Sequence, residues 1–286
     1  MAEYLIQGET LTGIADAIRE KTGGTDPVAV SDMAGKIAGI EAGGGDIDAL
    51  IDRSITEISS SSVTSIGSNA FYDCRKLTMV DFPVATSIGI YAFFACSALT
   101  MVDLPVATSI GNYAFSYCGA LTTVDFPVAT SIGSYAFRDC IALTTVDFPV
   151  ATSIGHNTFY SCGSLTTVDL PVLTSIGDNV FQYCSALTTA DFPVATSIKN
   201  YAFDSCGELK SLLLRGNNVC TLSSTSAFNS TPIASGTGYI YVPSALIEQY
   251  KAATNWSTYA AQFRTLEDYT VDGTVTGELD PAKTGT

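Results

Sequence analysis

A unit of 22 residues repeats along the middle of the chain without a change in length. It reads roughly L-T-T-V-D-F-P-V-A-T-S-I-G-x-Y-A-F-x-x-C-x-A. Two columns of residues mark it, with each Cys three residues after its Phe: Phe71, Phe93, Phe115, Phe137, Phe159, Phe181 and Phe203, then Cys74, Cys96, Cys118, Cys140, Cys162, Cys184 and Cys206. A fixed period of about 20–29 residues is typical of stacked solenoids, which bind partners along an extended surface.

The apolar spacing inside one unit predicts how a coil is built. In the segment 121–127 apolar residues stand at positions 1, 4 and 6, which is similar to the core of leucine-rich repeats. We expect Val124 and Phe126 to point inward from a strand that Pro127 ends, because proline has no N–H to donate. We expect Phe137 and Cys140 to lie on a short helical turn. The period predicts a right-handed leucine-rich repeat solenoid with a parallel β-sheet on one face and short helical turns opposite.

The seven repeated cysteines are expected to be free thiols. Stacking would bring them close together, but their Cα–Cβ bonds would run parallel, whereas a disulfide requires them to converge. We expect a buried column that packs as small apolar side chains. There is no C-x-x-C pair and His156 is the only histidine, so the sequence indicates no firm metal site.

Composition excludes two classes of partner. The chain has 286 residues and a net charge of -15, with 47% hydrophobic and 14% charged residues. Phosphate binding needs clustered Lys and Arg, so we expect no nucleic-acid partner and no attraction to anionic membranes. No apolar run is long enough to span a bilayer, so we expect no membrane insertion.

The ends of the chain do not repeat. Residues 1–42 predict two short amphipathic helices, which are too small to bury much apolar surface alone, so we expect this segment to dock to a particle or to oligomerise. Residues 43–62 are expected to be a linker and N-terminal cap, 63–230 the repeats, and 231–286 a C-terminal cap of strand, helix and tail. Because no signal peptide is evident, we expect a virion-associated protein or one that is cytoplasmic before release, with the cell surface as the alternative.

The I-G-x-x-A-F-x-x-C core recurs in order over about residues 50–230 and resembles the BspA-type leucine-rich repeat family. That resemblance implies surface adhesins of bacteria and protists. The segment LTGIADAIREKTGGTDPVAVSDMAGKIAGI is similar to a leader on phage and prophage tail-associated proteins of gut Firmicutes. Together the resemblances imply a tail-associated protein that presents a host-recognition solenoid. A cell-surface adhesin and a structural spacer without a specific ligand are the alternatives.

An aspartate recurs where each predicted strand ends: Asp81, Asp103, Asp125, Asp147, Asp169 and Asp191. Stacking predicts a row of carboxylates about 4.8 Å apart. Such a row can hold Ca²⁺ or a cationic ligand. It can also be structural, with each Asp accepting a backbone N–H bond beside the turn. Both interpretations stay open.

Positions around each core Phe differ between units, although the core positions barely change. We expect the ligand-binding residues there to be Tyr72, Phe94, Tyr117, Arg138, His156, Tyr160 and Tyr183. A mixture of Tyr, Ser, Asn and Asp is typical of binding surfaces, and the tyrosines can stack on sugar rings. Drift on an exposed edge would give the same pattern. The expected partner is a host cell-surface protein or glycan, and His156 is expected to be exposed.

The sequence contains no catalytic constellation. The carboxylates occupy equivalent repeat positions, whereas acid–base catalysis needs groups whose environments separate their pKa values. There is no second histidine and no G-x-S-x-G, Walker A or H-E-x-x-H motif. We expect a non-enzymatic binding protein without a cofactor, apart from the calcium considered above.

Overall fold

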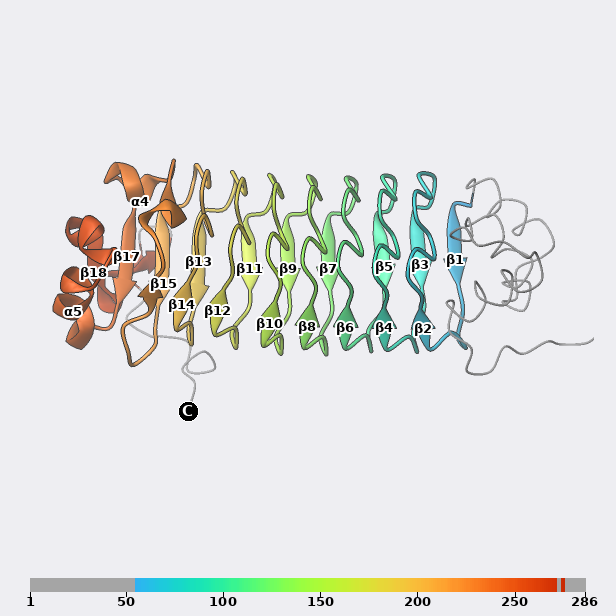
Figure 1. Ribbon diagram of the computed structural model, residues 1–286, viewed down its shortest axis with the longest axis horizontal. Coiled ribbons are helices and arrows are strands. Elements are labelled where there is room, and N and C mark those ends of the chain that lie inside the picture. Colours follow the sequence, from blue (N-terminus) through green and yellow to red (C-terminus); the bar gives the residue numbers. More distant parts are fainter. Residues whose placement is uncertain (1–54, 272–273, 276–286) are drawn as a thin grey trace, which may run out of the picture.

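The computed structural model describes residues 55–271 and 274–275, and these form a stack of coils with two short strands per coil. Figure 1 shows the coils side by side along the long axis, from β1 to a helical cap that carries α4 and α5. The predicted leucine-rich repeat solenoid with parallel β-sheets is confirmed. The two helices predicted within residues 1–42 lie outside the described residues.

The first strand of each coil lies where the repeat reads M-V-D or T-V-D, and the strands in the same position at the two ends of the stack have other sequences. These strands are β1 (Glu57–Ser59), β3 (Met79–Asp81), β5 (Met101–Asp103), β7 (Thr123–Asp125), β9 (Thr145–Asp147), β11 (Thr167–Asp169), β13 (Thr189–Phe192), β15 (Ser211–Leu214), β17 (Tyr239–Val242) and β18 (Phe263–Thr265). They pair in parallel in the orders β1-β3-β5, β7-β9-β11 and β13-β15-β17-β18. Equivalent residues pair with one another, as Val80 does with Val102.

The second strand of each coil carries the S-I dipeptide, which is replaced by Thr-Leu in the last of them. These strands are β2 (Ser65–Ile66), β4 (Ser87–Ile88), β6 (Ser109–Ile110), β8 (Ser131–Ile132), β10 (Ser153–Ile154), β12 (Ser175–Ile176), β14 (Ser197–Ile198) and β16 (Thr221–Leu222). They also pair in parallel, from β2 to β10 and from β12 to β16. The Pro-Val turn separates the two strands of a coil, since proline cannot donate to a ladder.

The third side of each coil is a series of turns. The expected short helices are absent from the described repeats between β1 and β16, where single hydrogen-bonded turns stand in their place. In the first coil, the N–H of Cys74 donates to the carbonyl of Phe71 at 3.2 Å and closes one such turn. Asn69 and Asp73 stand in the left-handed region, with φ of 59° and 62°. That conformation interrupts any helix and lets alternate N–H groups point to the next coil, as Phe71 N–H does to Ala92 O at 2.7 Å.

The core is a set of columns, one for each apolar position of the repeat. The rings of Phe71 and Phe93 stack with centroids 5.1 Å apart, and both are fully buried. All eight cysteines are buried and none forms a disulfide, which confirms the predicted thiol column. The Cys140 thiol donates to the carbonyl of Phe115 in the preceding coil at 3.2 Å. Burial raises the pKa of the Cys184 thiol to about 12, so it stays protonated at neutral pH.

A cap closes the C-terminal end of the stack. It contains η1 (Thr225–Phe228), α4 (Pro232–Ser235), η2 (Ser244–Leu246), α5 (Ile247–Ala252), η3 (Trp256–Gln262), η4 (Leu266–Asp268) and the hairpin β19 (Thr270–Val271) with β20 (Thr274–Val275). Trp256 and Tyr250 are fully buried. The Trp256 indole donates to the Cys220 carbonyl at 2.6 Å, and the Cys220 N–H donates to the Tyr250 hydroxyl at 2.9 Å. No helix among the described residues is both long and apolar enough to cross a membrane.

From β4 to β10 a glycine follows the second strand, because neighbouring coils approach each other closely there. A Cβ built on Gly89 would lie 2.5 Å from the backbone N of Ser68 in the preceding coil. A Cβ on Gly155 would lie 2.6 Å from the Cα of Ser134. Real Cβ atoms do not approach backbone that closely, so only glycine permits this coil spacing.

We therefore expect Gly155→Ala to lower the free energy of unfolding by about 1–3 kcal/mol, because the added methyl group must push two coils apart. Urea denaturation followed by circular dichroism measures this. Gly207→Ala is the matched control, since a Cβ there meets nothing within 4 Å. Equal unfolding midpoints for the two variants would show that the coil contact is not limiting.

Candidate functional site

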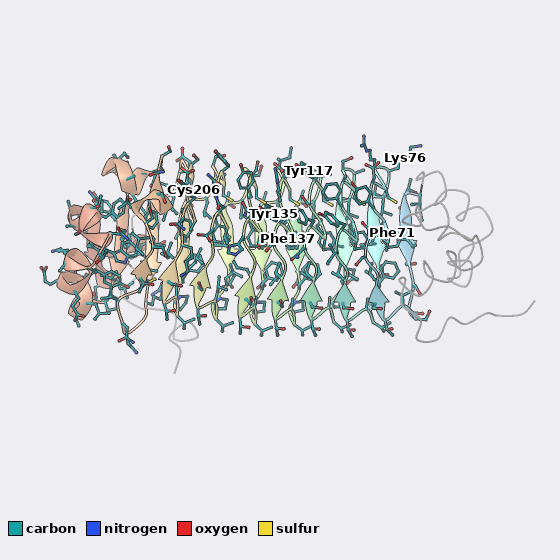
Figure 2. All side chains as sticks on the ribbon, viewed as in Figure 1. Phe71, Lys76, Tyr117, Tyr135, Phe137 and Cys206 are labelled. Atoms are coloured by element: carbon teal, nitrogen blue, oxygen red, sulfur yellow. The ribbon has the colours of Figure 1, made fainter. Side chains whose placement is uncertain are left out.

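One large side chain per coil lines the turn side of the solenoid. It directly follows the core Phe in four coils and stands one residue later in two. We call these six residues the turn ridge: Tyr72, Phe94, Tyr117, Arg138, Tyr160 and Tyr183. Coils lie about 4.8 Å apart, so the ridge is about 24 Å long. Figure 2 shows Tyr117 along the upper edge of the solenoid, the same edge as Lys76.

In the two coils where the residue directly after the core Phe is buried, the next residue supplies the large exposed side chain in its place. In the third coil the residue after the Phe is Ser116, which is fully buried, and the next residue, Tyr117, packs edge-on against Phe94 with centroids 5.4 Å apart. In the sixth coil Gln182 is buried and Tyr183 packs in the same way on the ring of the preceding coil. Random substitution would not maintain one large side chain in each of these coils. We therefore infer that packing or binding selects for a large side chain at the ridge.

A second aromatic column lies beside the ridge, and the sequence reasoning missed it. Tyr91 stacks on Tyr113 with centroids 4.8 Å apart, and Tyr113 stacks on Tyr135 at 4.6 Å. These residues belong to the consensus, at the position two before each Phe, so a search for variable positions passes over them. Desolvation and the neighbouring Tyr135 and Tyr91 raise the pKa of Tyr113, which keeps its hydroxyl a neutral hydrogen-bond donor.

The two columns join at the N-terminal end of the ridge. The rings of Tyr72 and Phe94 stack at 4.9 Å and 11°, and Tyr91 packs edge-on against both. One face of Tyr72 and one face of Phe94 are therefore covered by the other ring and are not open to a partner.

Arg138 stands within this aromatic surface. Its guanidinium carbon lies 5.2 Å from the ring centre of Tyr160, 5.7 Å from Tyr117 and 5.8 Å from Tyr135. Its Nε donates to Asp139 Oδ2 at 2.9 Å, and its side chain is 34% exposed. Arg138 is the only Lys or Arg between Lys76 and Lys199 in the sequence.

The structure places His156 in a different row, next to the ridge. The His156 side chain is 63% exposed, which agrees with the expectation, and its Nδ1 lies 3.5 Å from Asp178 Oδ2. Other members of this row cap backbone groups. Asp178 Oδ1 accepts the N–H of Asn200 at 3.0 Å, as the Asn112 side chain does for the next coil at 2.8 Å. The row thus helps to hold coils together.

The aspartate row lies on the T-V-D sheet face, away from the ridge. Asp81 pairs in register with Asp103, and Asp147 with both of its neighbours. Desolvation, then the charges of Asp169 and Asp125, raise the pKa of Asp147. At the end of the row Asp191 binds Arg215 through two oxygens, with N–O distances of 2.9–3.1 Å.

Neither interpretation of the aspartate row finds direct support. In the described part of the chain, the side chains of this row from Asp81 to Asp169 accept no hydrogen bond. Within the same residues no group of three or more His, Cys, Asp or Glu side chains could hold a metal ion. Calcium takes about 6–8 oxygen ligands, whereas each coil supplies one carboxylate to the row. Calcium binding therefore stays a prediction from the sequence.

We expect Asp147→Asn to raise the free energy of unfolding by about 0.2–1 kcal/mol at pH 7, because it removes repulsion between like charges in register. Because the pKa of Asp147 is raised in the folded state, the free energy of unfolding of the wild-type protein falls as the pH rises through that pKa. The gain should therefore vanish near pH 3, where the carboxyl is protonated in both states. Urea titrations at the two pH values measure it.

Asp191→Asn is the matched control in the same row. It breaks the two-oxygen contact with Arg215, whose side chain is only 17% exposed, so we expect a loss of about 1 kcal/mol at pH 7. If Asp147→Asn lowered stability at pH 7 as Asp191→Asn does, the row would not be self-repelling.

Comparison with known proteins agrees with this architecture. The family model described as "BspA type Leucine rich repeat region" matches in 6 copies, over residues 51–151 and 108–235. A search among curated proteins found no match.

Several solved structures are similar. A leucine-rich repeat protein of T. pallidum has 25% identity and a TM-score of 0.48, over 54% of this chain and 77% of that chain. A leucine-rich repeat protein of Bacteroides ovatus has 22% identity and a TM-score of 0.42, over 74% and 66%. A leucine rich cell surface protein of Faecalibacterium prausnitzii has 20% identity and a TM-score of 0.31, over 73% and 82%. The repeat match spans more than half of the residues, and the chain therefore belongs to the BspA-type leucine-rich repeat family.

Proposed function

We propose that this is a non-enzymatic recognition protein whose turn ridge binds a macromolecule on a host cell surface. The observation that carries the proposal is the compensation along the ridge, which keeps one large side chain in each of six successive coils. Five of the six are aromatic and the sixth is arginine. Tyr and Arg are the residues that most often dominate the free energy of protein binding.

The ring geometry favours a protein partner over a glycan. A sugar ring stacks on an open aromatic face, but in the tyrosine column beside the ridge both faces of Tyr113 are occupied, by Tyr91 and Tyr135. Tyr72 and Phe94 likewise cover one face of each other. Ring edges with hydroxyl groups form a flat amphipathic surface, which is the chemistry of protein interfaces.

The ridge predicts a large effect of two substitutions. We expect Tyr117→Ser or Tyr160→Ser to weaken binding of the purified full-length protein to host cells at least tenfold, which corresponds to about 1.4 kcal/mol, because each removes a ring from the contact. Flow cytometry on a cell type that the wild-type protein labels measures it.

Tyr201→Ser is the matched control for this experiment. Tyr201 and Tyr117 are both 42% exposed, but Tyr201 lies in the last full coil, outside the ridge. Equal loss of binding in all three variants, or no loss in any, would contradict a role for the ridge, and a wild-type protein that labels no host cell would favour a spacer.

We further propose that a phage or prophage tail carries this protein, with residues 1–42 as the docking or self-association segment. The support is the similarity of that segment to tail-associated leaders, together with its short length, since about 40 residues bury little apolar surface on their own. A bacterial surface adhesin of the same repeat family is the alternative. An adhesin would need residues 1–42 for neither particle incorporation nor assembly.

Deletion of residues 1–42 distinguishes a tail-associated protein from a bacterial surface adhesin. We expect the truncated protein to keep host-cell binding and to be lost from purified particles, because the repeats stack independently of the deleted segment. Immunoblotting of particles from a complemented deletion strain measures incorporation. Unchanged incorporation of the truncated protein would contradict docking through residues 1–42, and absence of the full-length protein from particles, with signal at the producing cell surface, would favour the adhesin.

A further inference from the structure

We infer that Arg138 forms a subsite for one carboxylate of a protein partner, the side chain of an Asp or Glu, at the middle of the turn ridge. The inference rests on the proposed function, because it assumes that the ridge is the contact surface. It adds the chemistry that selects the partner.

The guanidinium has unused donors in a suitable place. Arg138 uses Nε for Asp139 at 2.9 Å, and within the described residues its two Nη groups donate no hydrogen bond. The planar edge formed by the Nη groups matches the two oxygens of a carboxylate. Tyr117 and Tyr160 flank it from the preceding and following coils, within 5.7 and 5.2 Å.

The charge pattern limits the ligand to a single anionic group. No other Lys or Arg occurs between Lys76 and Lys199, and the whole chain carries a net charge of -15. A polyanion, such as an acidic polysaccharide or a nucleic acid, needs several cations along its path and would meet net repulsion here. One carboxylate on an otherwise neutral or basic protein surface needs only a single cation and is not repelled by the negative net charge of the chain.

The position within the ridge supports a central role. Arg138 is the fourth of six ridge residues, with three aromatic side chains before it and two after it. Residues that dominate binding lie near the centre of an interface, where surrounding contacts exclude water. The three tyrosine rings would do this around the ion pair and so strengthen it, because charges attract more strongly where water is excluded.

A displayed library of random linear peptides tests the inference without a known partner. The full-length protein is the bait for selection, and enriched peptides are then measured against variants. We expect enriched peptides to share one Asp or Glu beside apolar residues. Arg138→Gln, and replacement of that acidic residue by its amide, should each weaken binding at least tenfold. Arg138→Lys should also weaken binding, because lysine keeps the charge but lacks the planar fork.

Arg75→Gln is the control variant. The Arg75 Nε makes the same kind of contact, with Asp73 Oδ1 at 2.7 Å. However, the Arg75 side chain is 72% exposed and does not lie among the tyrosine rings that surround Arg138. We expect no change in peptide binding. Thermal unfolding of the Arg138→Gln protein should match wild type, which separates lost binding from lost folding.

The outcomes distinguish the two proposals. Peptides that require Tyr117 and Tyr160 but bind Arg138→Gln equally well would overturn the carboxylate subsite and leave the ridge in place. Failure to enrich any peptide that is sensitive to Tyr117→Ser would overturn both. Binding to monocarboxylated sugars on a glycan array, with none to peptides, would overturn the protein partner.

Discussion

The hydrogen bonds between successive coils are the interaction on which the rest of the structure depends. On the strand side, the N–H of Thr100 donates to Thr78 O at 2.9 Å, and its hydroxyl donates to the same carbonyl at 3.1 Å. On the turn side, alternate N–H groups reach forward to the next coil. Left-handed residues such as Tyr91 and Tyr113 make that direction possible, with φ of 57° and 58°. Such a conformation costs about 1–2 kcal/mol for a residue with a Cβ, and the inter-coil bonds offset it.

Register turns each position of the repeat into a column, and the column decides whether a residue type is favourable. Phe and Cys suit a column because identical neighbours pack and their groups are satisfied, as where the Cys118 thiol donates to Phe93 O at 3.2 Å. Asp suits it poorly, because identical neighbours repel. Only Asp191, at the end of the row, has a guanidinium against it. The same register carries the turn ridge, whose members differ from coil to coil because no interior packing fixes them.

Much of the fold follows from the sequence because the period is explicit. The apolar positions give the strands and the inward columns, and the even register follows from a unit of constant length. The left-handed residues do not follow from it. Tyrosine at Tyr91 or Tyr135 gives no local signal for positive φ, since the conformation is imposed by the next coil. Propensity reasoning therefore expects a helical turn at this place.

The candidate site divides in the same way. Variation between copies identifies Tyr72, Phe94 and Arg138, because exposed positions differ. It does not show that Tyr117 replaces the buried Ser116 as the large side chain of its coil. Nor does variation single out the stacked tyrosines, because Tyr is the commonest residue at their position, where three coils carry Asn69, Asn157 and Asn179 instead. Whether these tyrosines face solvent depends on the backbone conformation of the turn, and only the three-dimensional structure shows that conformation.

Thiol accessibility tests the stacked-column account most directly. The account requires all eight cysteines to be buried in the folded protein. Stopped-flow reaction with a chromogenic disulfide reagent should give no fast phase under native conditions and eight reactive thiols after denaturation in urea. Fast reaction of the repeat cysteines in the folded protein would contradict the account, because it would place the column, and with it the register of the ridge, outside a closed core.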